Sequence, residues 1–384
     1  MTIGLDETLA DLAREPNLEL RLFNPWTRRR IGGRAVQMLR EMERLNSRMH
    51  NKLVVVDGRA AIVGGRNIGD HYFGVAHDYN FRDLDVLAFG SLGHEAEEMF
   101  NEFWNSELVV SSENLTTEPD SERAEAGWTR LQQRTRSAEE LAAFPREPKD
   151  WRADLESLES ELHIGTSELI YDNVVGSEVS QSMFGNMIFL FNRAQHELLI
   201  TNAYIVPYQA GIDRLREVSS RGVDVRILTN SLETHDVPAV NAHYQRWRDD
   251  FILAGATLFE SRRDPEIRTE VEIPPFVGEF ISLHTKAAVV DRRQVFIGSM
   301  NLDPRSAVTN VEMGVIVDSP GLAQELAEMM LRDMSGENAW RVQLDDDGDL
   351  YWTNSDETVF RQPARGVMQR IANWFFRFVP KIQS

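Results

Sequence analysis

The chain has 384 residues, 42% of them hydrophobic and 27% charged, which is the composition of a folded globular protein. Acidic residues outnumber basic ones by 61 to 41, and the net charge of −20 argues against broad nucleic-acid binding, which needs basic surface to displace counterions. The absence of cysteine excludes disulfides, cysteine nucleophiles and zinc–thiolate sites. We find no apolar run long enough to span a membrane and no signal-peptide pattern at the start.

The first half of the chain carries few predicted elements before its main motif. A short helix over residues 6–14 and a strand over 18–23 come first, followed by the motif at 50–67. Residues 111–165 are rich in Glu, Ser and Thr and lack a strong strand signal. We interpret them as a linker with a surface helix near 137–143.

The second half alternates strands with helices, which is typical of an α/β sheet. The predicted order is a strand at 196–206, a helix at 209–222, a strand at 223–230, a helix at 238–254, a strand at 256–261, the second motif at 284–301, and a hairpin at 340–352. The hairpin turn falls at Asp347-Gly348. The aspartates around it lack EF-hand spacing, so a solvated turn is favoured over a calcium site.

An internal repeat sets the organisation. HNKLVVVDGRAAIVGGRN at 50–67 and HTKAAVVDRRQVFIGSMN at 284–301 share His, Lys, Asp, Gly and Asn at identical offsets, which indicates a duplicated domain. The second copy has more predicted elements before its motif than the first. The first copy is therefore expected to lack its first strand, a helix and its second strand; the alternative is a genuinely shorter first domain.

Each motif copy predicts one chemical face. Side chains alternate along a strand, so His50 and Lys52 face one side and Asp57 the other. Gly64-Gly65 in the first copy allows a close approach of the backbone to a ligand. The corresponding residues of the second copy are His284, Lys286, Asp291, Gly298 and Ser299.

Two such faces meeting would place two histidines, two lysines and two asparagines, Asn67 and Asn301, in one pocket. This set suits a phosphoryl centre. Lysines neutralise phosphate oxygens, asparagines stabilise charge in the transition state, one histidine attacks phosphorus and the other protonates the leaving oxygen. The lysines supply the positive charge, so neither a metal nor a cofactor is expected.

The pattern HxKxxxxD followed by G-[GS]-x-N, present twice, resembles the phospholipase D superfamily, whose members use a phosphohistidine intermediate. GGRNIGDHYFG, FRDLDVLAFG, ILTNSLETHDV, YQRWR, FIGSMNLDPRS and NVEMGV are similar to the bacterial cardiolipin synthase branch, from about Leu18 onward. The resemblance implies an α/β fold of two phospholipase D-like lobes, each a mixed sheet flanked by helices. The lobes would be related by pseudo-twofold symmetry, with the first incomplete.

The corresponding domain boundaries are a first lobe at 1–110, a linker at 111–165, a second lobe at 166–340, and a hairpin with a basic amphipathic tail at 341–384. Residues 361–384 hold five basic and no acidic side chains, with apolar residues at helical spacing. Such a helix suits a membrane interface. The alternative is a terminal helix packed on the core.

The resemblance also implies residue roles. His50 would be the nucleophile and His284 the general acid and later base, although the near symmetry of the copies makes the assignment reversible. An acidic residue one strand downstream would orient each histidine. The implied phosphate-binding residues are Lys52, Lys286, Asn67 and Asn301. The implied orienting acids are Glu312 for His284 and Asp85 for His50, with Asp83 as the alternative to Asp85. The motif residues with an implied structural role are Asp57, Asp291, Gly65 and Ser299.

The implied activity is a phosphatidyltransferase that makes cardiolipin from phospholipids, phosphatidylglycerol among them. The enzyme would lie peripherally on the bacterial cytoplasmic membrane, with the tail on its surface and no nucleic-acid partner. The alternatives are a phosphodiesterase or nuclease of the same superfamily, and an inactive lipid-binding fragment. His235 either lines the pocket or caps its loop. Four further residues form either the pocket rim or an ion-pair network: Arg66, Asp70, Asp303 and Arg305.

Overall fold

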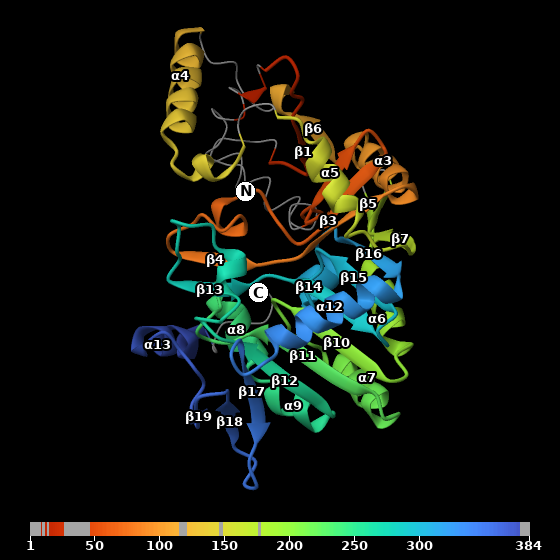
Figure 1. Ribbon diagram of the computed structural model, residues 1–384, viewed down its shortest axis with the longest axis vertical. Helices are drawn as coiled ribbons and strands as arrows, with labels where there is room; N and C mark the ends of the chain where they lie inside the picture. The colour runs from red at the N-terminus through yellow and green to blue at the C-terminus, as the bar shows by residue number, and fades with distance from the viewer. Residues whose placement is uncertain are drawn as a thin grey trace.

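The dominant feature of the molecule is a ten-stranded mixed sheet in the order β19-β18-β17-β12-β11-β10-β14-β15-β16-β7 (Figure 1). The computed structural model describes residues 9, 12–13, 15–26, 47–114, 121–145, 149–175 and 178–376. The strands are β7 (Thr166–Tyr171), β10 (Glu197–Asn202), β11 (Asp224–Asn230), β12 (Ala256–Ser261), β14 (Lys286–Val290), β15 (Gln294–Gly298), β16 (Met313–Asp318), β17 (Ala339–Leu344), β18 (Leu350–Thr353) and β19 (Thr358–Val359).

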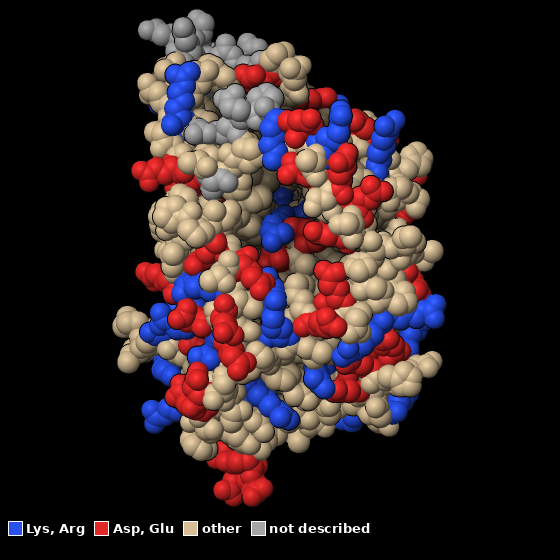
Figure 2. Space-filling model, in the orientation of Figure 1, with Lys and Arg blue, Asp and Glu red and all other residues tan. Residues whose placement is uncertain are grey.

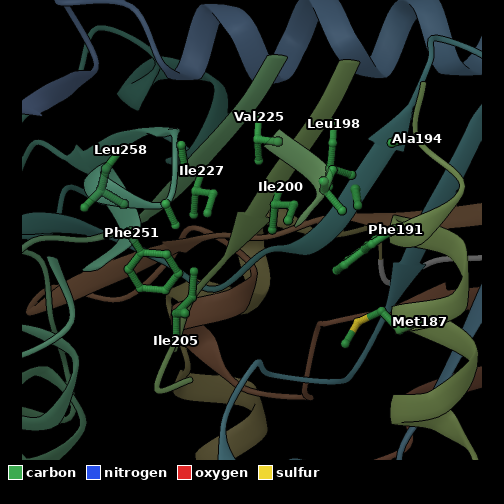
Figure 3. Close-up of a cluster of buried hydrophobic side chains, with 14 of the residues drawn as sticks. Met187, Phe191, Ala194, Leu198, Ile200, Ile205, Val225, Ile227, Phe251 and Leu258 are labelled. Carbon is green, nitrogen blue, oxygen red and sulfur yellow. The ribbon is translucent and has the colours of Figure 1, made fainter. Parts of the chain in front are cut away.

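Helices cover both faces of this sheet, which confirms the predicted α/β class. Along β10, Leu198 and Ile200 point to one face and Leu199 to the other, as the period of two along a strand requires. The first face packs on α6 (Met183–Asn192), α7 (Gln209–Ser220), α8 (Pro238–Tyr244) and α9 (Arg248–Leu253), and the second on α12 (Pro320–Asp333). Figure 3 shows part of the first cluster, with Phe191 and Phe251 entering from the helices.

The first half contributes a separate three-stranded antiparallel sheet in the order β2-β3-β5. It consists of β2 (Leu53–Val56), β3 (Ala60–Gly64) and β5 (Asp85–Phe89), followed by α3 (Ser91–Trp104). Val63 and three residues of α3 join the same apolar cluster as β14, β15, β16 and α12. The two sheets are therefore packed together through one continuous core.

The repeated motif folds into the same local structure in both copies. Each forms a hairpin, β2–β3 and β14–β15, with positive φ at the turn: 51° at Asp57 and 51° at Asp291. The surroundings differ. Val54 and Val56 are 54% and 53% exposed, because β2 is an edge strand within the described residues. Their counterparts Ala288 and Val290 are buried beside β10.

Shorter elements complete the fold, and one strand pair among them connects the two halves. Two pairs of strands are β1 (Arg21–Phe23) with β6 (Val109–Ser111) and β8 (Asn173–Val175) with β9 (Glu178–Ser180). A third pair joins the halves directly, β4 (Tyr79–Arg82) running parallel to β13 (Phe280–Leu283). The remaining short helices are η1 (Asp70–Tyr72), η2 (Ser112–Asn114), α10 (Arg268–Val271) and α11 (Pro304–Val308).

Two predicted elements differ in the structure, and a third is mostly outside the described residues. The linker helix expected near 137–143 is only the 3-10 turn η3 (Glu140–Ala143), while longer helices precede and follow it as α4 (Ser121–Ser137) and α5 (Arg152–Glu159). These helices have mainly polar surfaces, so hydrophobic periodicity did not reveal them. The helix expected at 238–254 is broken into α8 and α9. The helix expected at 6–14 lies mostly outside the described residues.

The predicted hairpin at 340–352 is β17–β18, and it extends the large sheet instead of standing apart from it. Beyond it, α13 (Val367–Phe376) packs against α8 through Asn373, whose Nδ2 lies 3.1 Å from Oε1 of Gln245. Residues 377–384 of the predicted tail helix lie outside the described residues. No helix in the described part of the chain combines the length and apolarity needed to cross a membrane.

Candidate active site

The two motif histidines are each held by a carboxylate from the other half of the molecule. Nδ1 of His50 lies 2.9 Å from Oε2 of Glu312, and Nδ1 of His284 lies 2.6 Å from Oδ2 of Asp83. Both carboxylate side chains are fully buried. An ionised carboxylate only accepts hydrogen bonds, so Nδ1 carries the proton in each ring and Nε2 is left for substrate.

This crossed pairing corrects the sequence-based prediction, which assigned Glu312 to His284 and Asp85 to His50. The backbone explains the exchange. His50 N donates to the carbonyl oxygen of Val311, the residue before Glu312, over 2.8 Å. In the same way, His284 N donates over 2.8 Å to the carbonyl oxygen of Arg82, the residue before Asp83. Each histidine is thus fixed beside the acid of the opposite half.

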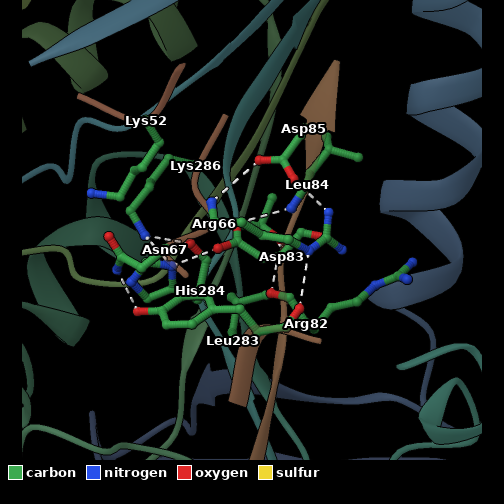
Figure 4. A network of polar contacts seen from close by, with 12 residues as sticks. Lys52, Arg66, Asn67, Arg82, Asp83, Leu84, Asp85, Leu283, His284 and Lys286 are labelled. Carbon is green, nitrogen blue, oxygen red and sulfur yellow. Dashed lines mark hydrogen bonds and ion pairs between the residues drawn. The ribbon is translucent and has the colours of Figure 1, made fainter. Parts of the chain in front are cut away.

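Asp85, predicted as an orienting acid, has a different partner. Its carboxylate accepts hydrogen bonds from Nη1 of Arg66 at 2.6 Å and from the Arg66 backbone N–H at 3.2 Å. Asp85 lies in β5, whereas Asp83 precedes the strand and reaches across to His284 (Figure 4). The structure therefore places Asp85 in an ion pair behind the site.

The two motif lysines lie close to each other on one side of His284 (Figure 4). Nζ of Lys52 donates to the carbonyl oxygen of His50 over 2.7 Å, and Nζ of Lys286 donates to that of His284. Nζ of Lys286 is also 3.0 Å from Nδ1 of His284. Figure 2 shows that this face of the molecule is hollowed between its upper and lower parts, with basic side chains in the hollow.

Burial controls the protonation of this cluster. It lowers the pKa of Lys52 to about 7 and that of Lys286 to about 8, against the partial opposition of nearby carboxylates. Burial, together with the charge of Lys286, lowers the pKa of His284 to about 4. For Asp83, burial raises the carboxyl pKa, but the charge and hydrogen bond of His284 outweigh it and the net pKa is lowered.

The motif asparagines flank the histidines. Asn67 donates from Nδ2 to the hydroxyl of Tyr72 over 2.7 Å. Asn301 is buried, and within the described residues its Oδ1 has no hydrogen-bond partner. A buried amide group without a partner is costly unless a ligand completes it. Oδ1 of Asn301 is therefore an acceptor that a hydroxyl group of a bound ligand could complete.

The remaining motif residues support the acids and the turns. Oγ of Ser299 donates to Glu312 over 2.6 Å, and a Cβ at the matching Gly65 would lie 2.2 Å from Oδ1 of Asp83. Glycine is therefore required there for the close approach of Asp83. Asp291 accepts backbone N–H groups of residues 195–197 and so ties the β14–β15 turn to β10. Asp57 occupies the matching turn of the first copy.

The four residues considered for the rim have separate positions. Arg66 forms the ion pair with Asp85, and Asp303 caps α11 by accepting the Ser306 N–H over 2.8 Å. Nε of Arg305 lies 3.4 Å from Oδ1 of Asn310. Asp70 begins η1 next to the Asn67 loop.

Aromatic residues that the sequence did not single out enclose His284. Its ring centroid lies 4.8 Å from that of Phe81, 5.0 Å from that of Tyr72 and 6.1 Å from that of Tyr204. Tyr204 in turn stacks on the buried His235 at 5.3 Å. His235 is buried behind Tyr204, and its Nδ1 accepts the N–H of Val237 over 3.1 Å, so it caps its loop and supports Tyr204 from behind. Only the three-dimensional packing of β4, η1 and the loop after β10 brings these rings together.

The arrangement is suited to transfer at phosphorus. Two carboxylate-held imidazoles can attack phosphorus and exchange a proton with the alcohol, while two ammonium groups and amide donors stabilise the anion. Within the described residues, no group of three or more His, Asp or Glu side chains could hold a metal ion.

Comparisons with known proteins agree with this chemistry. The family model described as cardiolipin synthase, PLD-like domain, matches residues 187–334. The chain is 32% identical over 391 residues to cardiolipin synthase C of Escherichia coli K12, covering 96% of this chain and 80% of that protein. An uncharacterized protein of Helicobacter pylori J99 is 30% identical, with 89% of this chain and 68% of that protein covered.

Among solved structures, the chain is similar to phosphatidylserine synthase of Haemophilus influenzae Rd KW20, with 15% identity, a TM-score of 0.49, and coverage of 74% of this chain and 62% of the other. The family assignment rests on the sequence relatives. The chain belongs to the cardiolipin synthase family of the phospholipase D superfamily. As a member of that family it is a phosphatidyltransferase.

Proposed function

We propose that this chain makes cardiolipin by transferring a phosphatidyl group from one phospholipid to a hydroxyl of phosphatidylglycerol through a phosphohistidine intermediate. The observation that carries the proposal is the pair of histidines, each with Nδ1 on a buried carboxylate and Nε2 left for substrate. The similarity to cardiolipin synthase C supports the choice of product.

In the first step, Nε2 of His50 attacks phosphorus while the bond from phosphorus to the headgroup oxygen breaks. His284 gives that oxygen its proton. In the second step, His284 takes the proton of the acceptor hydroxyl, whose oxygen attacks phosphorus as the bond to His50 breaks. Lys52 and Lys286 balance the phosphate charge. Water as acceptor gives phosphatidic acid, so hydrolysis is the expected side reaction.

The reverse assignment of the two histidines is supported by one observation. The lowered pKa of His284 keeps its ring neutral in the unliganded protein, and a neutral imidazole is the attacking form. In the first assignment, the anionic phosphodiester must favour proton uptake by His284 when it binds. Trapping of the phosphatidylated protein and its digestion at alkaline pH, where the acid-labile bond between nitrogen and phosphorus survives, followed by peptide mass spectrometry, identifies which histidine carries phosphorus.

The same proposal includes contact with a lipid bilayer through α13. Its apolar side chains are exposed to solvent in the structure, at Val367, Met368, Ile371, Trp374 and Phe375. The helix also carries Arg370 and no acidic residue. An amphipathic helix of this composition is suited to the membrane interface, where it would hold the enzyme peripherally on the bacterial cytoplasmic membrane.

The test is product analysis by mass spectrometry on vesicles of phosphatidylglycerol. The wild-type chain is expected to form cardiolipin, and His50→Ala and His284→Ala are expected to lose this product. His94→Ala is the matched control, because His94 is exposed on α3 and pairs only with Glu98 one turn along. Wild-type levels of cardiolipin from either motif variant would contradict the proposal.

A further inference from the structure

Tyr204 and Asp236 form a pair beside His284 that the steps above do not use. The hydroxyl of Tyr204 lies 2.7 Å from both carboxylate oxygens of Asp236. The Tyr204 ring is perpendicular to the His284 ring at 6.1 Å, and its centroid is 5.8 Å from Nζ of Lys286. The carboxylate is thus one aromatic ring away from the imidazole and the ammonium group that handle the phosphate.

The Tyr204 ring does not depend on Asp236 for its position. It stacks on His235 with an angle of 20° between the ring planes. His235 is itself fixed, since it is buried and its Nδ1 accepts the N–H of Val237 over 3.1 Å. The packing of the Tyr204 ring therefore requires neither its hydroxyl group nor the Asp236 carboxylate that this hydroxyl contacts.

Asp236 also has acceptor capacity left over. A carboxylate offers about four lone-pair directions. Among the described residues, no Lys or Arg nitrogen lies within ion-pair distance of it, and Nδ1 of His235, 3.9 Å away, is an acceptor for the Val237 N–H and not a cationic partner. Its side chain is 13% exposed, so a hydroxyl-bearing ligand can reach it.

The two sides of the site differ in a way that suits two different ligands. The His50 side chain is 26% exposed, whereas that of His284 is 5% exposed and enclosed by aromatic rings. In the proposed reaction, both the departing headgroup and the acceptor alcohol exchange their proton with His284. The enclosed, polar-ended side therefore fits the glycerol end of a headgroup or acceptor better than the acyl chains of a lipid.

We propose that Tyr204 and Asp236 bind the second hydroxyl of a vicinal diol while its first hydroxyl attacks phosphorus. This inference rests on the proposed function and names how the same site selects its acceptor. The attacking oxygen forms the new bond to phosphorus, the bond from phosphorus to histidine breaks, and the proton passes to His284. The neighbouring hydroxyl donates to Asp236, which favours a glycerol group over water or a simple alcohol.

The experiment measures how one intermediate divides between two acceptors. Vesicles of dioleoyl phosphatidylglycerol are incubated with equal concentrations of deuterated glycerol and 1-propanol. Mass spectrometry then gives the ratio of deuterated phosphatidylglycerol to phosphatidylpropanol. The ratio is independent of the amount of folded enzyme, so a general loss of stability does not change it.

Asp236→Ala and Tyr204→Phe are each expected to lower this ratio about tenfold, the typical effect of losing a hydrogen bond to a charged group. Asp236→Glu is expected to restore part of it. Asp213→Asn on α7 is the matched control, since its carboxylate is exposed and pairs only with neighbours on its own helix.

The inference would be overturned if the ratio stayed the same in both variants, whether transfer to the two alcohols were undiminished or equally reduced. A wild-type chain that forms neither transfer product nor cardiolipin would instead remove the proposed function itself. The two failures are therefore distinguishable.

Discussion

Asp83→Asn tests the crossed pairing of histidines and acids directly. The substitution keeps the shape of the side chain, so the contact with the Leu84 N–H at 2.9 Å and the fit against Gly65 are expected to persist. What is lost is the negative charge 2.6 Å from Nδ1 of His284. Because Oδ1 keeps the Leu84 N–H, the amide Nδ2 takes the place of Oδ2 opposite Nδ1 of His284, so an imidazolium formed there has neither a negative charge nor an acceptor beside it.

The size of the effect follows from this geometry. Two unit charges whose centres are about 4 Å apart attract by about 4 kcal/mol at an effective dielectric constant of about 20. A loss of that size in the transition state lowers the rate about a thousandfold, at about 1.4 kcal/mol per decade. The unfolding free energy is expected to change much less, because the neutral amide also relieves the burial of a charge.

The assay is the initial rate of phosphatidyl transfer from phosphatidylglycerol vesicles, with Asp85→Asn as the matched control. Asp85 is only two residues away and pairs with Arg66 instead of a histidine. Its substitution is expected to lower the rate less than tenfold. If Asp85→Asn lost as much activity as Asp83→Asn, or if Asp83→Asn kept more than a tenth of the wild-type rate, the reasoning would be refuted.

Three further results are expected. The KM for the phospholipid is expected to rise as pH increases through about 7 to 8. Lys52 and Lys286 are charged below their lowered pKa values and neutral above them, so they stop balancing the phosphate charge as pH rises. A KM that stays constant over that range would contradict this prediction. Arg248→Met is expected to lower the free energy of unfolding in urea by about 3–5 kcal/mol, because it leaves Glu260 buried without its ion-pair partner at 2.6 Å. The control Arg226→Met breaks an exposed ion pair and is expected to cost at most about 1 kcal/mol. Equal losses from the two variants would contradict this prediction. Ile371→Asp on α13 is expected to weaken vesicle cosedimentation about tenfold. The urea midpoint is expected to stay the same, because the Ile371 side chain is 53% exposed. Undiminished cosedimentation would exclude α13 as the membrane contact.

The strands of the second half could be predicted from sequence because their signals are local. The apolar run of β11 and the alternation of β12 each lie within a few residues of the predicted bounds. The repeat at 50–67 and 284–301 predicted a strand in each copy, and the structure has β2 and β14 there, each followed at a matching offset by an aspartate with the same positive φ. Polar surface helices such as α4 carry no comparable periodicity and were missed.

The pairing of histidines with acids could not be predicted in the same way. Glu312 follows His284 by 28 positions and Asp85 follows His50 by 35, so each copy offers an acid about one strand downstream of its own histidine and suggests a local partner. The actual choice depends on backbone bonds between distant segments, such as His50 with Val311. The same holds for Tyr204, whose place beside His284 follows from the way the sheets meet.

The crossed acids also determine when the chain can become active during its synthesis. His50 is separated from Glu312 by 262 positions, and His284 from Asp83 by 201. A ribosome-bound first half therefore presents a histidine and a lysine but no acid for that histidine. If the proposed reaction holds, attack on a phospholipid has to wait until most of the second half has emerged and folded against the first.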